Sequence, residues 1–235
     1  MSPRQVAAEP GAQLDSPAPL SRDAITHAAI EFIEHRGLER LTMRALAQQL
    51  GCGTMSLYRY VANRDDLVGA IIEELVDRSD LPELARRRFK NWQEMSVAAI
   101  LAYKDLAVAY PGSFELLALA PYDAEPVSSH IERMATALQG TGLTERQAYE
   151  VLGGLDAYAT GYLLVWARAR GASGDASGPA ALRKIRDIDE FERGLRVFVA
   201  GYEATLRYRP APPTQSMRLL RAVLLGTQLS KQHLP

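Results

Sequence analysis

Two short stretches decide the fold: Thr42-Met-Arg-Ala-Leu-Ala-Gln-Gln-Leu-Gly51 and Gly53-Thr-Met-Ser-Leu-Tyr-Arg-Tyr-Val61. The first opens with a threonine, which is a good N-cap residue, and Gly51 is a typical residue to end a helix. The second predicts a helix from Gly53 or Thr54 through Val61, with Leu57 and Val61 packed inward. We therefore expect two short helices separated only by a tight turn.

A helix is predicted on each side of this pair. Ser21 can cap a helix of about four turns whose apolar residues recur every three or four positions until Gly37. Asn63 can cap another that runs to about Asp80, with two aspartates in the first turn, where the helix dipole favours anions. The segment from Thr42 to Val61 is therefore predicted to be a helix, a short turn and a second helix, preceded by a supporting helix.

Composition describes an ordinary folded protein. The chain has 235 residues, 47% of them hydrophobic and 23% charged, with a net charge of −1, which favours one or two globular domains. The longest charge-free run, Ala45–Tyr58, is too short and too polar to span a membrane. Cys52 is the single cysteine and the N-terminus lacks the apolar core of a secretory signal, so we expect a cytoplasmic protein.

The remainder of the chain predicts helices alone, since no segment alternates as a strand does, and the fold class is all-α. We expect residues 1–19, rich in Ala and Pro, to be a disordered tail and residues 171–179 to be a surface loop. We expect two domains, a small N-terminal helical domain over residues 20–66 and a larger C-terminal helical domain over residues 67–235. The helices predicted after residue 80 are at about 84–110, 113–120, 126–139, 144–170, 180–208 and 216–230.

The second short helix has the chemistry of a DNA-reading helix. A major groove accepts one helix, and short polar side chains on it reach base edges. The exposed face between Arg44 and Arg59 is uncharged and rich in hydroxyls, where an ordinary solvated helix would carry Glu and Lys. On this ground Gly53, Thr54, Met55, Ser56 and Tyr60 are assigned to DNA. Arg59 and Arg64 are assigned to phosphates, and Arg44, at the start of the preceding helix, to a guanine edge. The alternative, three small helices that merely cap a larger bundle, stays open at this point.

Three segments, Leu41–Gly51, Ser56–Val61 and Asn63–Leu67, resemble the N-terminal domain of TetR-type regulators, over about residues 20–80. The resemblance implies an all-α homodimer, joined through a four-helix bundle, that binds a palindromic operator in double-stranded DNA. It also implies a one-component repressor whose C-terminal domain binds a small-molecule effector and thereby releases the DNA. Base or near-base contacts are implied for Arg44, Thr54, Ser56 and Tyr60, and backbone contacts for Thr42, Tyr58 and Arg64.

Two positions depart from the repressor for which the family is named. Gly53 replaces a polar side chain and Met55 replaces a proline, so a different operator is expected. Farther along, Tyr110 stands where that repressor has a magnesium-binding histidine. A phenol is a poor ligand for magnesium, so recognition of a metal complex is not expected.

Aromatic and methionine side chains after residue 90 are candidates for an apolar effector pocket. Such pockets combine apolar walls with a few polar groups. The residues assigned to it are Trp92, Met95, Tyr103, Tyr110, Phe114, Met134, Tyr158, Tyr162 and Trp166. The alternative is that most of them are core residues.

Small residues at helical spacing are candidates for a subunit interface, because they let helix axes approach closely. The residues assigned to dimerisation are Gly154, Ala157, Gly161, Gly194 and Gly201. The alternative is packing within one chain.

No motif points to an enzyme. The chain has no Gly-rich phosphate loop after a strand, no Gly-x-Ser-x-Gly and no zinc spacing among its four histidines. We expect neither a cofactor nor a bound metal. The sequence thus predicts a ligand-responsive transcriptional repressor. The alternatives are a helical ligand-binding or interaction module without specific DNA binding, and a small all-α enzyme.

Overall fold

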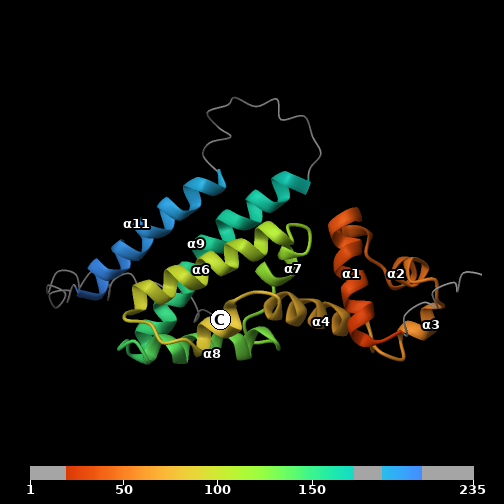
Figure 1. Cartoon of the computed structure of the whole chain (residues 1–235), viewed down its shortest axis with the longest axis horizontal. Helices are drawn as coiled ribbons and strands as arrows, with labels where there is room; N and C mark the ends of the chain where they lie inside the picture. The colour runs from red at the N-terminus through yellow and green to blue at the C-terminus, as the bar shows by residue number, and fades with distance from the viewer. Residues whose placement is uncertain (1–19, 172–186, 208–235) are drawn as a thin grey trace, which may run out of the picture. The chain divides into compact units, whose positions relative to one another are not determined.

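The computed structural model describes residues 20–171 and 187–207, and within these ranges the protein is helical and without strands (Figure 1). The chain divides into two compact units between Ile71 and Ile72, inside one helix. The domain boundary expected after residue 66 stays a prediction. The expected tail (1–19), the expected loop (171–179, apart from Gly171), the start of the predicted helix 180–208 and the whole of 216–230 lie outside the described residues.

The first unit contains the predicted helix-turn-helix and the helix before it. Ser21 caps the first helix, accepting a hydrogen bond from the Ala24 amide, and Thr42 caps the next, accepting from the Ala45 amide. Gly51, with a φ of 65°, makes the turn that follows, a conformation that costs little only in glycine. The elements are α1 (Arg22–Arg36), the 3₁₀ turn η1 (Leu38–Arg40), α2 (Met43–Gln49), α3 (Thr54–Leu57) and α4 (Arg64–Asp77).

Two helices are shorter than predicted. The helix expected through Val61 ends at Leu57, because the amides of Tyr60 and Val61 both donate to the Leu57 carbonyl and tighten the chain into a turn. Leu57 and Val61 are nevertheless fully buried, as predicted. The helix expected to reach Asp80 ends at Asp77, where the Ser79 hydroxyl donates to the Val76 carbonyl and ends the helical pattern.

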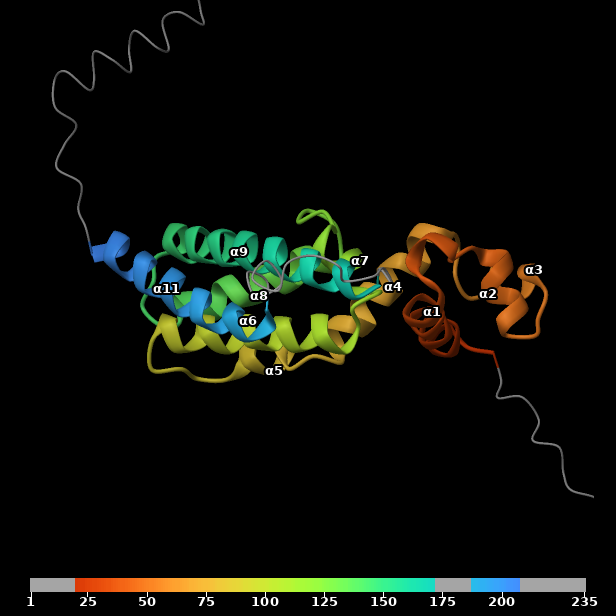
Figure 2. The ribbon, with the colours of Figure 1, turned by 90° about the horizontal axis from the view of Figure 1, so that it is seen from above.

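The second unit is a bundle around a long central helix, α9, against which α6, α8 and α11 pack (Figure 2). The prediction of a single helix over residues 84–110 is wrong, because the helical conformation is interrupted between Arg86 and Trp92. Asn91 restarts the helix by accepting a hydrogen bond from the Glu94 amide at 2.8 Å. The elements are α5 (Leu81–Arg86), α6 (Trp92–Ala109), α7 (Phe114–Ala118), α8 (Val127–Gln139), α9 (Glu145–Gly171) and α11 (Ile188–Arg207).

Candidate DNA-binding surface and ligand cavity

The predicted DNA-reading face lies on the surface of the first unit. Met55, at the start of α3, is 77% exposed although it is large and apolar, and Tyr58 and Tyr60 are also exposed. Arg44, Arg59 and Arg64 are exposed, and none forms an ion pair with any residue in the described ranges. An unpaired, solvent-facing guanidinium group is free to meet a phosphate or a guanine edge.

The remaining predicted contacts surround this face. Thr42 is exposed and its hydroxyl is engaged as the N-cap of α2, whereas Thr54 and Ser56 are half-buried. Gly53 is exposed and caps α3 with an ordinary φ of −75°. A Cβ at this position would meet only the Ser56 hydroxyl, at 4.0 Å. The fold itself would therefore accept a larger side chain in place of Gly53. The position of this glycine at the exposed end of α3 suits a close approach of its backbone to a ligand.

An ion pair fastens the segment after α3 to the first helix. The Arg22 guanidinium donates to both carboxylate oxygens of Asp66, at 2.6 and 3.0 Å, and also to the Tyr60 carbonyl. The Ala62 amide donates to the same carboxylate at 2.7 Å. These hydrogen bonds lower the pKa of Asp66 from 3.8 to about 2, the one from Arg22 contributing most. Sequence reasoning placed Asp66 only in the first turn of α4 and missed this partner.

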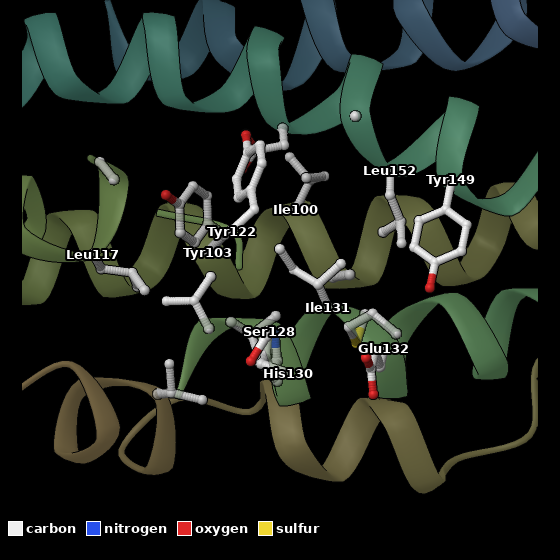
Figure 3. A pocket seen from close by; sticks show the side chains of 18 of the residues that line it. Ile100, Tyr103, Leu117, Tyr122, Ser128, His130, Ile131, Glu132, Tyr149 and Leu152 are labelled. Atoms are coloured by element: carbon white, nitrogen blue, oxygen red, sulfur yellow. The ribbon is translucent and has the colours of Figure 1, made fainter. Parts of the chain in front are cut away.

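The second unit holds a cavity of about 670 Å³, large enough for a drug-sized molecule (Figure 3). Its walls come from α4 through α9, with α8 and α9 facing each other across it. Leu152 and Tyr149 project into it from α9, opposite Ile131 and His130 of α8 (Figure 3). Most of the lining is aliphatic or aromatic, so the site favours an apolar ligand body.

One set of polar groups lies beside α9. The Tyr122 hydroxyl donates to Asp156, and the Thr160 hydroxyl also reaches that carboxylate, at 3.3 Å. Tyr103 and Thr160 share a hydrogen bond of 3.3 Å between their hydroxyls. The hydrogen bond to Asp156 raises the pKa of Tyr122 to about 12, and burial raises that of Tyr103 further. Both phenols are therefore neutral donors at pH 7.

His130 lies on the α8 side of the cavity. Burial, with a smaller contribution from the positive charge of Arg133, lowers the pKa of its imidazole to about 4. Its Nδ1 atom is buried and makes no hydrogen bond within the described part of the chain. A neutral imidazole with an unused ring nitrogen is well suited to orient a ligand that offers a matching hydrogen-bonding group.

Of the nine residues assigned to an effector pocket, the structure brings Tyr103 and Met134 to the cavity. Trp92 and Met95 are core side chains, as are Phe114 and Trp166 in a second cluster. For those four the core alternative holds, because aromatic and methionine residues at helical spacing fill a bundle interior as well as a pocket.

The other three assigned residues also lie outside the cavity lining. Tyr110 receives a hydrogen bond of 3.1 Å from Arg78, whose guanidinium also lies 5.4 Å from the centre of its ring. Tyr158 donates to the Phe191 carbonyl at 2.8 Å, and Tyr162 packs edge-on against the Phe191 ring. Tyr158 and Tyr162 thus join α9 to α11.

Sequence reasoning missed most of the cavity's polar residues. Tyr122 and Asp123 follow α7 in a loop, and Asp156 interrupts an otherwise weakly charged stretch of α9. The available signal was the pair Asp156 and Thr160, four residues apart on one helix face. His130 carried no signal of its own, since its role depends on α8 lying opposite α9.

The residues assigned to dimerisation fall into two groups. A Cβ on Gly154 would overlap the Tyr202 hydroxyl, and one on Gly194 would overlap that of Tyr158, so these two glycines permit close packing of α9 on α11 within the chain. Ala157, Gly161 and Gly201 are instead exposed. A Cβ on either of the latter two glycines would meet nothing within 4 Å.

No described helix is long and apolar enough to cross a membrane. Likewise, the described residues contain no group of three or more His, Cys, Asp or Glu side chains placed to hold a metal ion.

Comparison with known proteins agrees with this arrangement. The family model described as "Bacterial regulatory proteins, tetR family" matches residues 25–71, which contain the helix-turn-helix. Over these residues the chain matches the TetR family. The chain is 28% identical over 142 residues to the HTH-type transcriptional repressor DrrR1 of Streptomyces coeruleorubidus, a match that covers 60% of this chain. The chain spans only 52% of the length of that relative.

The likeness to known proteins extends to the second unit of this chain. The tetracycline repressor protein class D of Escherichia coli is 26% identical over 206 residues, covering 81% of this chain and 89% of the relative. A "possible TetR family transcriptional regulator" of Streptomyces coelicolor A3(2) has the same fold, with a TM-score of 0.67, 24% identity and coverage of 79% and 100%. The S. coelicolor TetR family protein ActR, solved in complex with (S)-DNPA, matches with a TM-score of 0.60 and 25% identity. This match covers 80% of this chain and 99% of the ActR chain.

Proposed function

We propose that this TetR-family protein is a ligand-responsive transcriptional repressor that a small molecule releases from a palindromic operator. One observation carries the proposal: a single chain combines an exposed, hydroxyl-bearing helix-turn-helix with a separate apolar cavity of about 670 Å³. The names of the relatives support it, since they include an HTH-type repressor and a tetracycline repressor.

Operator reading is assigned to α3 and the start of α2. Met55, Ser56 and Tyr60 offer an apolar contact and two hydroxyls to base edges in the major groove. Arg44 suits a guanine edge, because a guanidinium bonds both acceptors of guanine at once. Arg59 and Arg64 suit phosphates, which give affinity and a dependence on salt but no sequence information.

A dimer follows from the size of the reading helix. One short helix contacts too few bases, whereas two of them one DNA turn apart read a palindrome. We assign the interface to the exposed small residues of α9 and α11, namely Ala157, Gly161 and Gly201, together with the exposed Val165 and Val197. Burying these side chains between two chains would form a four-helix bundle about a two-fold axis.

The helix α4 provides the link between ligand and DNA. It begins beside the Arg22–Asp66 ion pair and ends with Val76 in the cavity wall. A ligand that fits the cavity better in one position of α4 shifts the population toward that position, and only this difference in affinity can be transmitted. A coupling of about 1–3 kcal/mol is typical of allosteric proteins.

We also assign the protein to the cytoplasm, where its DNA would be, and to binding without turnover of the ligand. The relatives reported above are named as regulators. Mass analysis of the released ligand after incubation tests the second point, because an enzyme would return a changed molecule.

Binding to duplex fragments from upstream of the protein's own coding region tests the DNA assignment. Arg44→Ala should weaken binding to the preferred fragment about 5- to 150-fold, as expected for a lost bidentate base contact. It should change binding to unrelated duplex much less. Arg146→Ala removes the same charge from α9 and serves as the control. Equal losses on both duplexes for Arg44→Ala would disprove base readout by this residue.

A further inference from the structure

The charges around the cavity are all of one sign. Three carboxylates line it, those of Asp123, Glu132 and Asp156, and its lining contains no Lys or Arg. None of the three forms an ion pair with a residue in the described part of the chain. The cavity therefore presents a negative potential to whatever enters it, concentrated by its apolar walls.

Asp156 is the most enclosed of the three, since it is half-buried whereas Asp123 and Glu132 are exposed. Its two partners, the hydroxyls of Tyr122 and Thr160, donate hydrogen bonds but do not cancel its charge. The hydrogen bond to this carboxylate raises the pKa of Tyr122, with smaller contributions from burial and from the negative charge of Asp156. A carboxylate in this setting gains most from a cation, because burial strengthens charge pairing.

The other polar groups do not supply that cation. His130 faces the cavity as a neutral ring at pH 7, because burial lowers its pKa to about 4. Arg133, the basic residue that influences His130, is exposed and is not part of the lining. Tyr103 and Ser128 contribute hydroxyls only. The positive charge is therefore left for the ligand to bring.

The spacing of the carboxylates favours an organic cation over a metal ion. Asp156 lies on α9, Glu132 on α8 and Asp123 in the loop before α8, on different walls (Figure 3 shows Glu132). Within the described ranges no three His, Cys, Asp or Glu side chains converge closely enough to coordinate a metal. About 670 Å³ of mostly apolar space remains between them, enough for a ring system.

We propose that the effector is a bulky, mainly apolar organic cation, such as an aromatic amine protonated at its nitrogen, whose charge pairs with Asp156. This inference rests on the function proposed above and adds the chemical class of its ligand. The apolar walls bind the body of the molecule, and the carboxylates select its charge. Anionic molecules of the same shape are disfavoured by the same three groups.

Three fluorescent probes of one shape test the charge preference of the full-length protein at pH 7. They are 9-(aminomethyl)anthracene, which is cationic, 9-anthracenemethanol, which is neutral, and anthracene-9-carboxylate, which is anionic. We expect the amine to bind at least about tenfold more tightly than the alcohol, and the carboxylate to bind weakest. Equal affinities, a preference for the carboxylate, or no binding of any probe at about 1 mM would overturn the inference.

A pair of variants locates the preference. Asp156→Asn keeps the shape of the side chain and should reduce the preference for the amine over the alcohol to about twofold or less, with little change for the alcohol. Glu150→Gln removes one charge from the same helix outside the cavity and should keep the preference. An unchanged preference in Asp156→Asn would overturn the assignment to Asp156, and retained binding of the alcohol shows that the cavity is intact.

The failure of this inference is distinguishable from failure of the proposed function. If the neutral or anionic probe binds best and releases a specific DNA fragment, the repressor remains and only the ligand class is wrong. If no fragment is bound specifically at physiological salt, the proposed function itself fails, whatever the probes show.

Discussion

The ion pair between Arg22 and Asp66 is expected to stabilise the first unit, which is proposed to bind DNA, by a measurable amount. It holds α1 to the start of α4 and, through the Tyr60 carbonyl, to the turn that ends the reading segment. Asp66→Asn preserves the size of the side chain but removes its charge. Asp65→Asn removes an equal charge from the same first turn of α4, where Asp65 is exposed, and so controls for the helix dipole.

The magnitude follows from the pKa of Asp66. Lowering this pKa from 3.8 to about 2 on folding corresponds to about 2.4 kcal/mol in the free energy of unfolding, before solvent screening is considered. The side chains of Arg22 and Asp66 are 42% and 31% exposed, so solvent screening reduces this to about 1 kcal/mol. Relative to Asp65→Asn, the Asp66→Asn variant should therefore exchange its α1 amide hydrogens about fivefold faster at pH 7.

The lowered pKa of Asp66 also sets the direction in which stability changes with pH. A carboxyl with a lowered pKa contributes its stability above about pH 4 and loses it as the pH falls through about 2. At pH 3 the free-energy difference between the two variants should fall to about half its value at neutral pH. Hydrogen exchange of α1 measured at both pH values checks this. No difference at pH 7, or an equal difference at both, would refute the reasoning.

Two further predictions concern the second unit. His130 should titrate with a midpoint near pH 4 in NMR spectra, and a midpoint near 6.5 would contradict its burial. Because the imidazole of the unfolded chain is protonated at a higher pH than that of the folded chain, the free energy of unfolding should fall as the pH drops below about 6.5. Gly154→Ala should lower the melting temperature, because its Cβ meets the Tyr202 hydroxyl, whereas Gly161→Ala should keep or raise it but weaken the dimer in sedimentation measurements. Equal melting temperatures for the two variants, or an unweakened dimer in Gly161→Ala, would oppose these assignments.

The parts of the fold that follow from local chemistry were predictable from sequence. Ser21, Thr42 and Asn63 act as the expected N-caps, because a side-chain oxygen placed before a helix can satisfy only nearby amides. The break before α6 was missed, although Asn91 followed by Glu94 is a capping pattern. A continuous apolar periodicity on both sides of the break concealed it.

The parts of the candidate site that lie close together in the sequence were predictable, whereas the parts that distant segments bring together were not. The residues proposed to read DNA lie within one continuous segment, so sequence spacing was enough to place them together. The cavity depends on which face of α8 meets which face of α9, and that is set by packing between distant segments. Tyr103 and Met134 were therefore found, whereas Tyr122, His130 and Asp156 required the three-dimensional structure.

Footprinting of the region upstream of the protein's own coding sequence, at about 150 mM salt, tests the central claim most directly. The account predicts one protected palindrome with half-sites about one DNA turn apart, bound by a dimer at nanomolar concentration. Uniform weak binding that disappears with salt, and no protected site, would contradict it.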